Sequence, residues 1–158
     1  MLDGAMKRAP VLACQMTMLT TQTAPEELRE RARRSFVTDP KYGSFRAVLG
    51  HLREHCPAAK PVVVRTGWLG AETAGECTRR AERFVIRLGG HLDEDAAVDA
   101  LLHEWAHALA WNYTLDKLAR TPGLDPAGFQ IAAHDEAWGC AYSRVWRAYL
   151  MMNEAMSR

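Results

Sequence analysis

The pattern of apolar and polar positions is clearest between Asp95 and Trp111, a stretch that reads as one helix. It contains neither Gly nor Pro and is rich in Ala and Leu, which are the best helix formers. Acidic residues at its start, Asp93 and Glu94, can cap the free amides and suit the helix dipole. Because apolar residues surround the helix almost completely, we expect it to be buried and central.

The sides of this helix differ in the size of their residues. The bulky side is formed by Val98, Leu102, Trp105 and Leu109. At 100° per residue, another stripe carries His103 and His107. The same stripe holds three small residues, Ala96, Ala100 and Ala110. The small side chains leave room for an ion, a water molecule and a substrate beside the two histidines.

Shorter periodic segments predict the other elements. They are helices at 25–36 and 40–55, strands at 61–69 and 83–88, and a final helix from His134 to about Met152. The two strands follow one another without a helix between them, so we expect them to pair antiparallel.

Glycines and prolines mark the connections between these elements. Residues 70–82 are predicted to link the two strands, and residues 125–128 to continue a loop after a helix that runs on to about Leu118. Residues 1–24 show no clear pattern, and we expect a flexible or loosely docked N-terminal segment there. The remainder, 25–158, is expected to form a single domain.

The composition of the 158 residues is that of an ordinary globular protein, with 48% hydrophobic and 25% charged residues. The net charge of +1 gives no strong signal for nucleic acid or membrane binding, and no apolar run reaches the ~18 residues of a membrane span. None of the four cysteines forms a C-x-x-C pair, which excludes a cysteine-based zinc ribbon. Unpaired thiols point to a reducing compartment, so we expect a cytoplasmic protein. The sequence gives no signal for an oligomeric state.

The central helix carries the motif H-E-x-x-H, formed by His103, Glu104 and His107. Residues four apart on a helix share one face, so both imidazoles can reach a single ion. Zn²⁺ at a catalytic site takes three protein ligands and leaves one position open. Glu104 projects about 100° around the helix, where it can accept a proton from the water that such an ion activates. The motif therefore predicts a catalytic zinc site.

A second motif, H-x-x-E-H, runs from His51 to His55. It lies in the last turn of its predicted helix, its histidines flank the apolar stripe, and Glu54 points away from that stripe. Histidines near a helix C-terminus also interact favourably with the helix dipole. We therefore expect no metal at His51 and His55.

The third zinc ligand must come from outside H-E-x-x-H. The extended motif with a further Gly and His is absent, because Ala110 and Tyr113 stand at those positions. The candidates are His134, Asp135 and Glu136 at the predicted start of the final helix. His134 shares a face with apolar residues that must pack inward, whereas Glu136 lies about 200° away. We prefer His134, and Glu136 and Asp135 stay open as alternatives.

On these residues the chain resembles a SprT-like zinc metallopeptidase domain, within the wider zincin and small gluzincin-like group. The resemblance rests on R-F-V-I-R-L, on L-L-H-E-W-A-H-A-L-A-W and on a later H-D-E-A-W-G-C-A-Y-S-R-V-W. It implies that His103, His107 and His134 are ligands and that Glu104 is the base. The family usually has Gly after the third His, where this chain has Asp135.

We expect an α+β fold of the zincin kind, with N-terminal helices, a small antiparallel sheet, the H-E-x-x-H helix and a C-terminal packing helix. The predicted function is zinc-dependent hydrolysis of peptide bonds in a protein or peptide, with Glu104 as general base. The alternative is a non-catalytic, zinc-stapled protein-binding module of the same fold. Because a structural zinc site needs no base, the intact Glu104 favours the enzyme.

The second predicted strand is a candidate for holding the substrate. If it is the sheet edge, its main chain can pair with an extended peptide; if it is central, it offers no such surface. The candidate substrate-binding residues on this strand are Phe84, Val85, Ile86 and Arg87. Tyr142, on the inward face of the final helix, is a candidate oxyanion donor or a core residue.

Overall fold

The structure of the chain is a computed structural model that describes residues 13–17, 25–32 and 42–158. The elements in these ranges are β1 (Cys14–Thr17), α1 (Pro25–Ala32), α2 (Gly43–His55), β2 (Val62–Gly67), β3 (Thr73–Arg79), β4 (Phe84–Gly89), α3 (Glu94–Ala110), α4 (Tyr113–Ala119), α5 (Pro126–Ala133) and α6 (Glu136–Met156). The α+β class is confirmed: the described residues form six helices and one sheet of four strands.

The sheet is mixed, with the strand order β1–β3–β4–β2. β2 runs parallel to β4, β3 runs antiparallel to β4, and β1 runs antiparallel to β3. The expected antiparallel pairing of β2 with β4 is therefore wrong. The chain makes an additional pass between them along the sequence, as β3, so that β4 returns in the direction of β2.

β3 lies in the segment 70–82, which was expected to be a connection with two glycines, Gly70 and Gly75. In the structure it is an inner strand, and its neighbours on both sides bury Ala74, Gly75, Cys77 and Thr78. β1 was also not predicted. It is a four-residue strand within the segment 1–24, and apart from Ala13 the rest of that segment lies outside the described residues.

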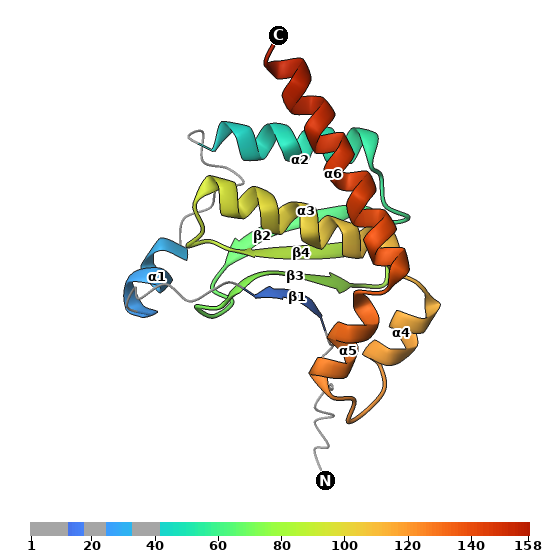
Figure 1. The fold of residues 1–158 in the computed structure, drawn as a ribbon. Helices are drawn as coiled ribbons and strands as arrows, with labels where there is room; N and C mark the ends of the chain where they lie inside the picture. The colour runs from blue at the N-terminus through green and yellow to red at the C-terminus, as the bar shows by residue number, and fades with distance from the viewer. Residues whose placement is uncertain (1–12, 18–24, 33–41) are drawn as a thin grey trace.

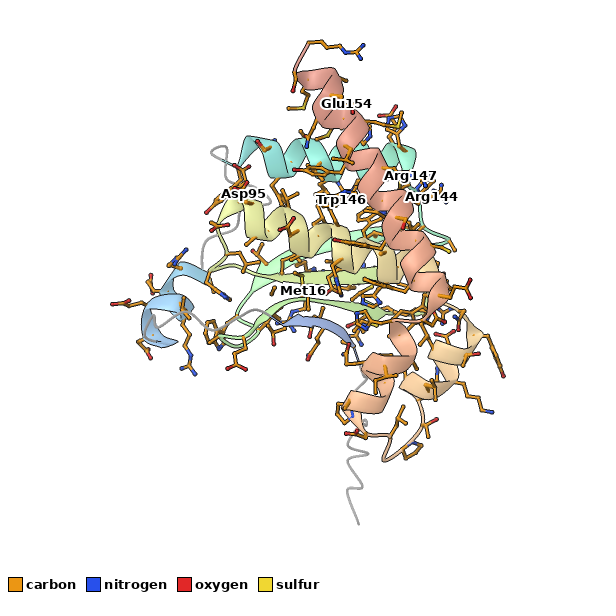
Figure 2. All side chains as sticks on the ribbon, viewed as in Figure 1. Met16, Asp95, Arg144, Trp146, Arg147 and Glu154 are labelled. Atoms are coloured by element: carbon orange, nitrogen blue, oxygen red, sulfur yellow. The ribbon has the colours of Figure 1, made fainter. Side chains whose placement is uncertain are left out.

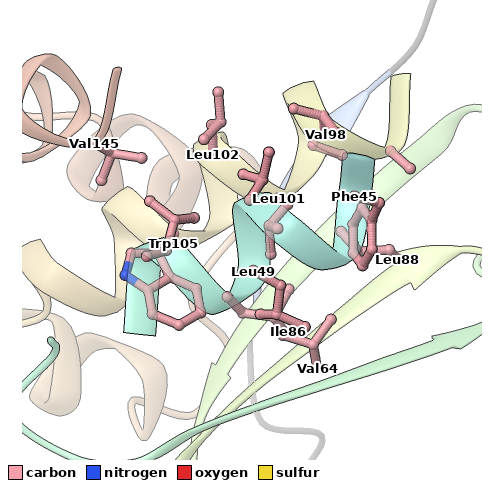
Figure 3. Packing of buried hydrophobic residues seen from close by; sticks show 14 of the residues in the cluster. Phe45, Leu49, Val64, Ile86, Leu88, Val98, Leu101, Leu102, Trp105 and Val145 are labelled. Carbon is pink, nitrogen blue, oxygen red and sulfur yellow. The ribbon is translucent and has the colours of Figure 1, made fainter. Parts of the chain in front are cut away.

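Helices α2, α3 and α6 cover one face of the sheet in two layers (Figure 1). α3 lies directly on the sheet, and α2 and α6 pack against α3. α4 and α5 lie together beyond one end of the sheet, beside the start of β1. The shared core joins α2, α3 and the sheet, as the close view of Phe45, Leu49, Ile86 and Leu101 shows (Figure 3).

Trp105 anchors α3 in this core. Its ring is 1% exposed, and its indole N–H donates a hydrogen bond of 2.8 Å to the carbonyl oxygen of Cys56 after α2. Truncating a buried Trp typically costs about 3–5 kcal/mol. The packing and hydrogen bond of Trp105 therefore hold in place the turn of α3 that carries His103 and His107.

Side-chain caps set the ends of α3 and α4. The Asp93 carboxylate accepts a hydrogen bond from the amide of Ala96 at 2.8 Å, which satisfies one of the free donors at the start of α3. Asn112 in turn accepts from the amide of Leu115 at 3.0 Å and begins α4. The expected continuous helix to Leu118 is therefore interrupted after Ala110.

α5 corrects the prediction of a loop at 125–128. The Asp125 carboxylate accepts from the amide of Gly128, and Pro126 occupies the first turn, where its missing N–H costs nothing. Because α5 ends at Ala133 and α6 begins at Glu136, His134 lies in the junction between two helices and not at the start of the last one.

None of the helices in the described ranges is both long enough and apolar enough to cross a lipid bilayer.

Candidate metal centre

α3 presents His103 and His107 one turn apart on its small-sided stripe. Their Nε2 atoms lie 3.2 Å apart. His107 is 1% exposed, whereas His103 is half-buried and borders the junction between α5 and α6. Ala100 on the same stripe is fully buried.

The α5–α6 junction brings His134 to the same point. Its Nε2 lies 3.1 Å from the Nε2 of His103. Its other ring nitrogen, Nδ1, lies 2.7 Å from the carbonyl oxygen of Gln130. A carbonyl only accepts, so Nδ1 carries the proton and Nε2 keeps its lone pair for a ligand.

The three histidines fit a metal ion. One ligand nitrogen from each lies within 4.8 Å of the others, and no other group of three or more His, Cys, Asp or Glu residues in the described part of the chain meets this condition. Zinc–nitrogen bonds of about 2.0–2.1 Å at tetrahedral angles place two ligand nitrogens about 3.3 Å apart. The Nε2 separations of 3.1 and 3.2 Å are close to that spacing.

Burial keeps two of the imidazoles in the neutral form that binds metal. It lowers the pKa of His103 from 6.5 to about 4, with a further contribution from the charge of His134. It lowers the pKa of His107 to about 2, with contributions from His103 and His134, against a smaller opposing effect of the Ala133 main chain. Both rings are therefore unprotonated at neutral pH.

Glu104 points from α3 toward the sheet. It is 0% exposed, and neither carboxylate oxygen has a hydrogen-bond partner in the described part of the chain. Burial, and secondarily the charge of Glu76, raise its pKa well above the usual range, while the nearby main-chain amide of Met16 lowers it. A buried carboxyl without partners is costly, and such groups gather at functional sites.

Trp138 forms a wall of the site that the sequence analysis did not identify. Its ring centroid lies 4.7 Å from that of His134, 4.9 Å from that of His103 and 5.5 Å from that of His107. Tyr142 stacks on the other side of Trp138 at 5.1 Å, and its ring lies 6.3 Å from that of His103. The four-residue spacing from His134 through Trp138 to Tyr142 was the available signal.

The alternative ligands have other places in the structure. The Asp135 carboxylate caps α6 by accepting from the amide of Trp138 at 3.0 Å. Glu136 lines a groove between α2 and α6, and His51 and His55 line the same groove. Asp135, Glu136, His51 and His55 are not in the group formed by the three histidines.

The candidate substrate-binding strand does not lie at the sheet edge. β4 pairs with β2 on one side and with β3 on the other, so its main-chain donors and acceptors are occupied by neighbouring strands. Phe84 and Ile86 are buried beneath the helices. Of the two alternatives for Phe84, Val85, Ile86 and Arg87, the edge-strand one is therefore wrong, and the edge strands of the sheet are β1 and β2.

Comparison with known proteins identifies no relative: no family model, no curated protein and no solved structure matches the chain. The similarity to SprT-like domains therefore stays a resemblance carried by the motif residues. The geometry of the three histidines and Glu104 stands independently of it.

Proposed function

We propose that the chain is a zinc-dependent peptidase. The observation that carries the proposal is the convergence of three imidazole Nε2 atoms, two of them from the helix turn that also carries the buried, unpartnered Glu104. Three histidines are a donor set that suits zinc, because imidazole is a ligand of intermediate softness and three protein ligands leave one position for chemistry.

Glu104 is the proposed general base. A zinc ion bound at this site would supply a Lewis acid that polarises a carbonyl and acidifies water. A nearby cation also favours the ionised form of Glu104, which counteracts the effect of burial on its pKa. In the ionised form, Glu104 takes a proton from the attacking water and delivers it to the leaving amide nitrogen.

Two aromatic residues support this chemistry. Trp138 lies against all three imidazoles and keeps bulk water from one side of the site. Burial, with the charge of Asp99, raises the pKa of Tyr142, so its hydroxyl keeps its proton and can donate a hydrogen bond. We propose Tyr142 as a donor to the oxygen that gains negative charge, as in other oxyanion sites.

The group of three histidines favours an enzyme over a zinc-stapled binding module. Structural zinc sites are closed by four protein ligands. Among the described residues no fourth His, Cys, Asp or Glu joins the three histidines. The unpartnered carboxyl of Glu104 would also serve no purpose in a purely structural site.

The test compares Glu104→Gln with His134→Ala in metal content and in hydrolysis of an unfolded protein. Glu104→Gln should keep about one zinc and lose roughly 10²–10⁴-fold in rate, because the amide cannot accept a proton. His134→Ala should lose most of its zinc. Glu136→Gln, an exposed carboxylate outside the site, is the matched control and should behave as wild type. Hydrolysis by Glu104→Gln within tenfold of wild type would remove Glu104 from the mechanism.

A further inference from the structure

β1 seals Glu104 from solvent. Glu104 lies over the seam between β1 and β3, where Met16 and Gly75 are register partners. A Cβ placed on Gly75 would lie 2.8 Å from Cγ of Glu104, and the amide of Met16 is close enough to affect the carboxyl. Met16 lies on β1 beneath α3 (Figure 2). A base that takes a proton from water must reach water and substrate. The segment that covers Glu104 at this seam, β1, must therefore move away first.

β1 is held through its main chain along both edges. On one side it pairs antiparallel with β3, from Cys14 to Thr17. On the other side, the Gln130 side chain accepts from the amide of Gln15 at 3.2 Å and donates to the carbonyl of Ala13 at 2.8 Å. One side-chain amide thus makes the two contacts that a neighbouring strand would make. None of these contacts depends on the side chains of β1.

Gln130 also belongs to the metal centre. Its side chain contacts β1, and its own carbonyl oxygen accepts from Nδ1 of His134. An extended segment held between β3 and Gln130 therefore lies at a fixed position relative to the three histidines. The irregular register between Met16 and Thr17 falls at the point where Glu104 meets the seam.

We propose that β1 occupies the slot in which the main chain of an extended peptide substrate binds, with β3 and the Gln130 amide as its walls. This rests on the proposed peptidase function. The chain's own N-terminal strand is then an intramolecular occupant that a substrate must displace. Because both walls contact main-chain atoms, the slot accepts unfolded protein segments of varied sequence. The bond to be cleaved takes the position of the Met16 main chain, next to Glu104.

Two cysteines report on this movement without any chemistry at the metal. Cys14 and Cys77 are register partners across the β1–β3 seam, and both are fully buried. Cys56 is buried after α2, away from the seam, and Cys140 is exposed. The rate at which each thiol reacts with iodoacetamide, followed by mass spectrometry, separates opening of β1 from global unfolding.

The first experiment compares the wild type with Gln130→Ala. The substitution removes both contacts to β1 but keeps the carbonyl that holds His134. Cys14 and Cys77 should react before Cys56, and Gln130→Ala should accelerate them roughly tenfold, as expected for two lost hydrogen bonds. Ile131→Ala, at an exposed neighbouring position, is the control. Labelling of Cys14 and Cys77 only together with Cys56, at a rate that Gln130→Ala leaves unchanged, would overturn the proposal.

The second experiment adds the probe, reduced and carboxymethylated α-lactalbumin, to the Glu104→Gln variant, which cannot consume it by the proposed chemistry. If the probe enters the slot, Cys14 on the displaced strand should react faster while Cys77, now beneath the probe, stays protected. Equal labelling of Cys14 with and without saturating probe would overturn the proposal. This readout holds whether or not the chain is a peptidase.

The third experiment fixes β1 in place. Directly opposed residues of antiparallel strands have Cα atoms about 4.5–5.5 Å apart, within the range that a disulfide spans. Treatment with diamide transfers two hydrogen atoms from the thiols of Cys14 and Cys77 to the reagent and joins their sulfurs. The cross-linked, zinc-loaded chain should lose hydrolysis of the same probe, and dithiothreitol should restore it.

Cys14→Ala, which cannot form this cross-link, should not respond to diamide. Full activity of the cross-linked chain would show that substrate does not need the position of β1. Absence of hydrolysis in the reduced wild type with zinc bound would instead refute the proposed function, and the labelling experiments would still decide whether β1 fills a peptide-binding slot.

Discussion

Gly75 determines where Glu104 can lie. The nearest atoms to a Cβ at this position would be Cγ of Glu104 at 2.8 Å, Cδ2 of Leu88 at 3.0 Å and Oε1 of Glu104 at 3.2 Å. The absence of a side chain in β3 therefore makes the space for the proposed base. Conformational freedom is not the reason for a glycine here, because Gly75 has an ordinary strand backbone within a regular ladder.

We predict that Gly75→Ala displaces the Glu104 carboxylate while the three histidines keep their zinc. Misplacement of a catalytic group by about 1 Å can cost on the order of 10²-fold in rate, and we expect a loss of at least tenfold in peptide hydrolysis. Zinc content and kcat are the measurements. Gly50→Ala in α2, where a Cβ meets nothing within 4 Å, is the control. An unchanged kcat in Gly75→Ala would separate Glu104 from the chemistry.

Residues of the candidate site could be predicted from the sequence where their side chains are typical metal ligands. The spacing of H-E-x-x-H alone identified His103 and His107 as members of the group of three histidines. The third member, His134, was identified from the apolar face of the predicted final helix, although His134 lies in the junction before α6 and not within it. Nothing in the sequence indicated a role for Gln130 or Met16. Gln130 acts through a side-chain amide that occurs throughout proteins, and Met16 acts through its main chain.

At the scale of elements, strongly periodic segments were predicted well and short or capped ones were not. α2, α3, β2 and β4 lie within two or three residues of their predicted bounds. β3 was missed because an inner strand of small residues lacks the large apolar alternation of a strand. Because β3 was not predicted, the expected direction of β2 relative to β4 was also wrong, and whether β4 is an edge or a central strand stayed open.

The inner position of β4 predicts the behaviour of Val85→Pro. Proline removes a ladder donor and is tolerated essentially only at edges or bulges. Within β4 it leaves a buried acceptor unpaired, and we expect the free energy of unfolding to fall by at least about 3 kcal/mol. Urea unfolding followed by circular dichroism measures this. Val85→Ala, which keeps the donor, should lose much less, and a proline variant as stable as the alanine variant would contradict the strand order.

At the scale of the whole molecule, the metal-free protein holds ionisable groups in neutral forms at its centre. Burial lowers the pKa values of His103 and His107 and raises that of Glu104. Buried His91, beneath α1, has a pKa lowered in the same sense as the other histidines. These groups make stability depend on pH, and the sign follows from which state binds more protons.

We predict that the metal-free protein loses stability as the pH falls from 6.5 to 5. In this window an unfolded chain protonates His103 and His107, whose folded pKa values are about 4 and about 2, so acid favours unfolding. Glu104 opposes this, because its raised pKa keeps a proton in the folded state that the unfolded state releases above the ordinary carboxyl pKa of 4.5. The unfolded imidazoles are only half protonated at pH 6.5, so two groups against one leave a loss of about 1.4 kcal/mol over the whole window from pH 6.5 to 5.

Urea unfolding in excess chelator at pH 7.5, 6.5 and 5.5 measures this dependence. Glu104→Gln removes the opposing group, so its stability should fall more steeply with acid than that of the wild type. A free energy of unfolding that stays constant or rises between pH 6.5 and 5.5 would show that the central histidines are not held neutral.

The position of β1 sets an order of events during synthesis. β1 leaves the ribosome before both of its partners, and one of them, Gln130, lies 117 residues after Ala13 and 115 after Gln15. Its pairing with β3 must also wait for about sixty further residues, and contacts between such distant segments form slowly. The strand made first is therefore the last to find both of its neighbours. A nascent chain therefore passes through a stage in which β1 can pair with β3 but has no neighbour on its Gln130 side.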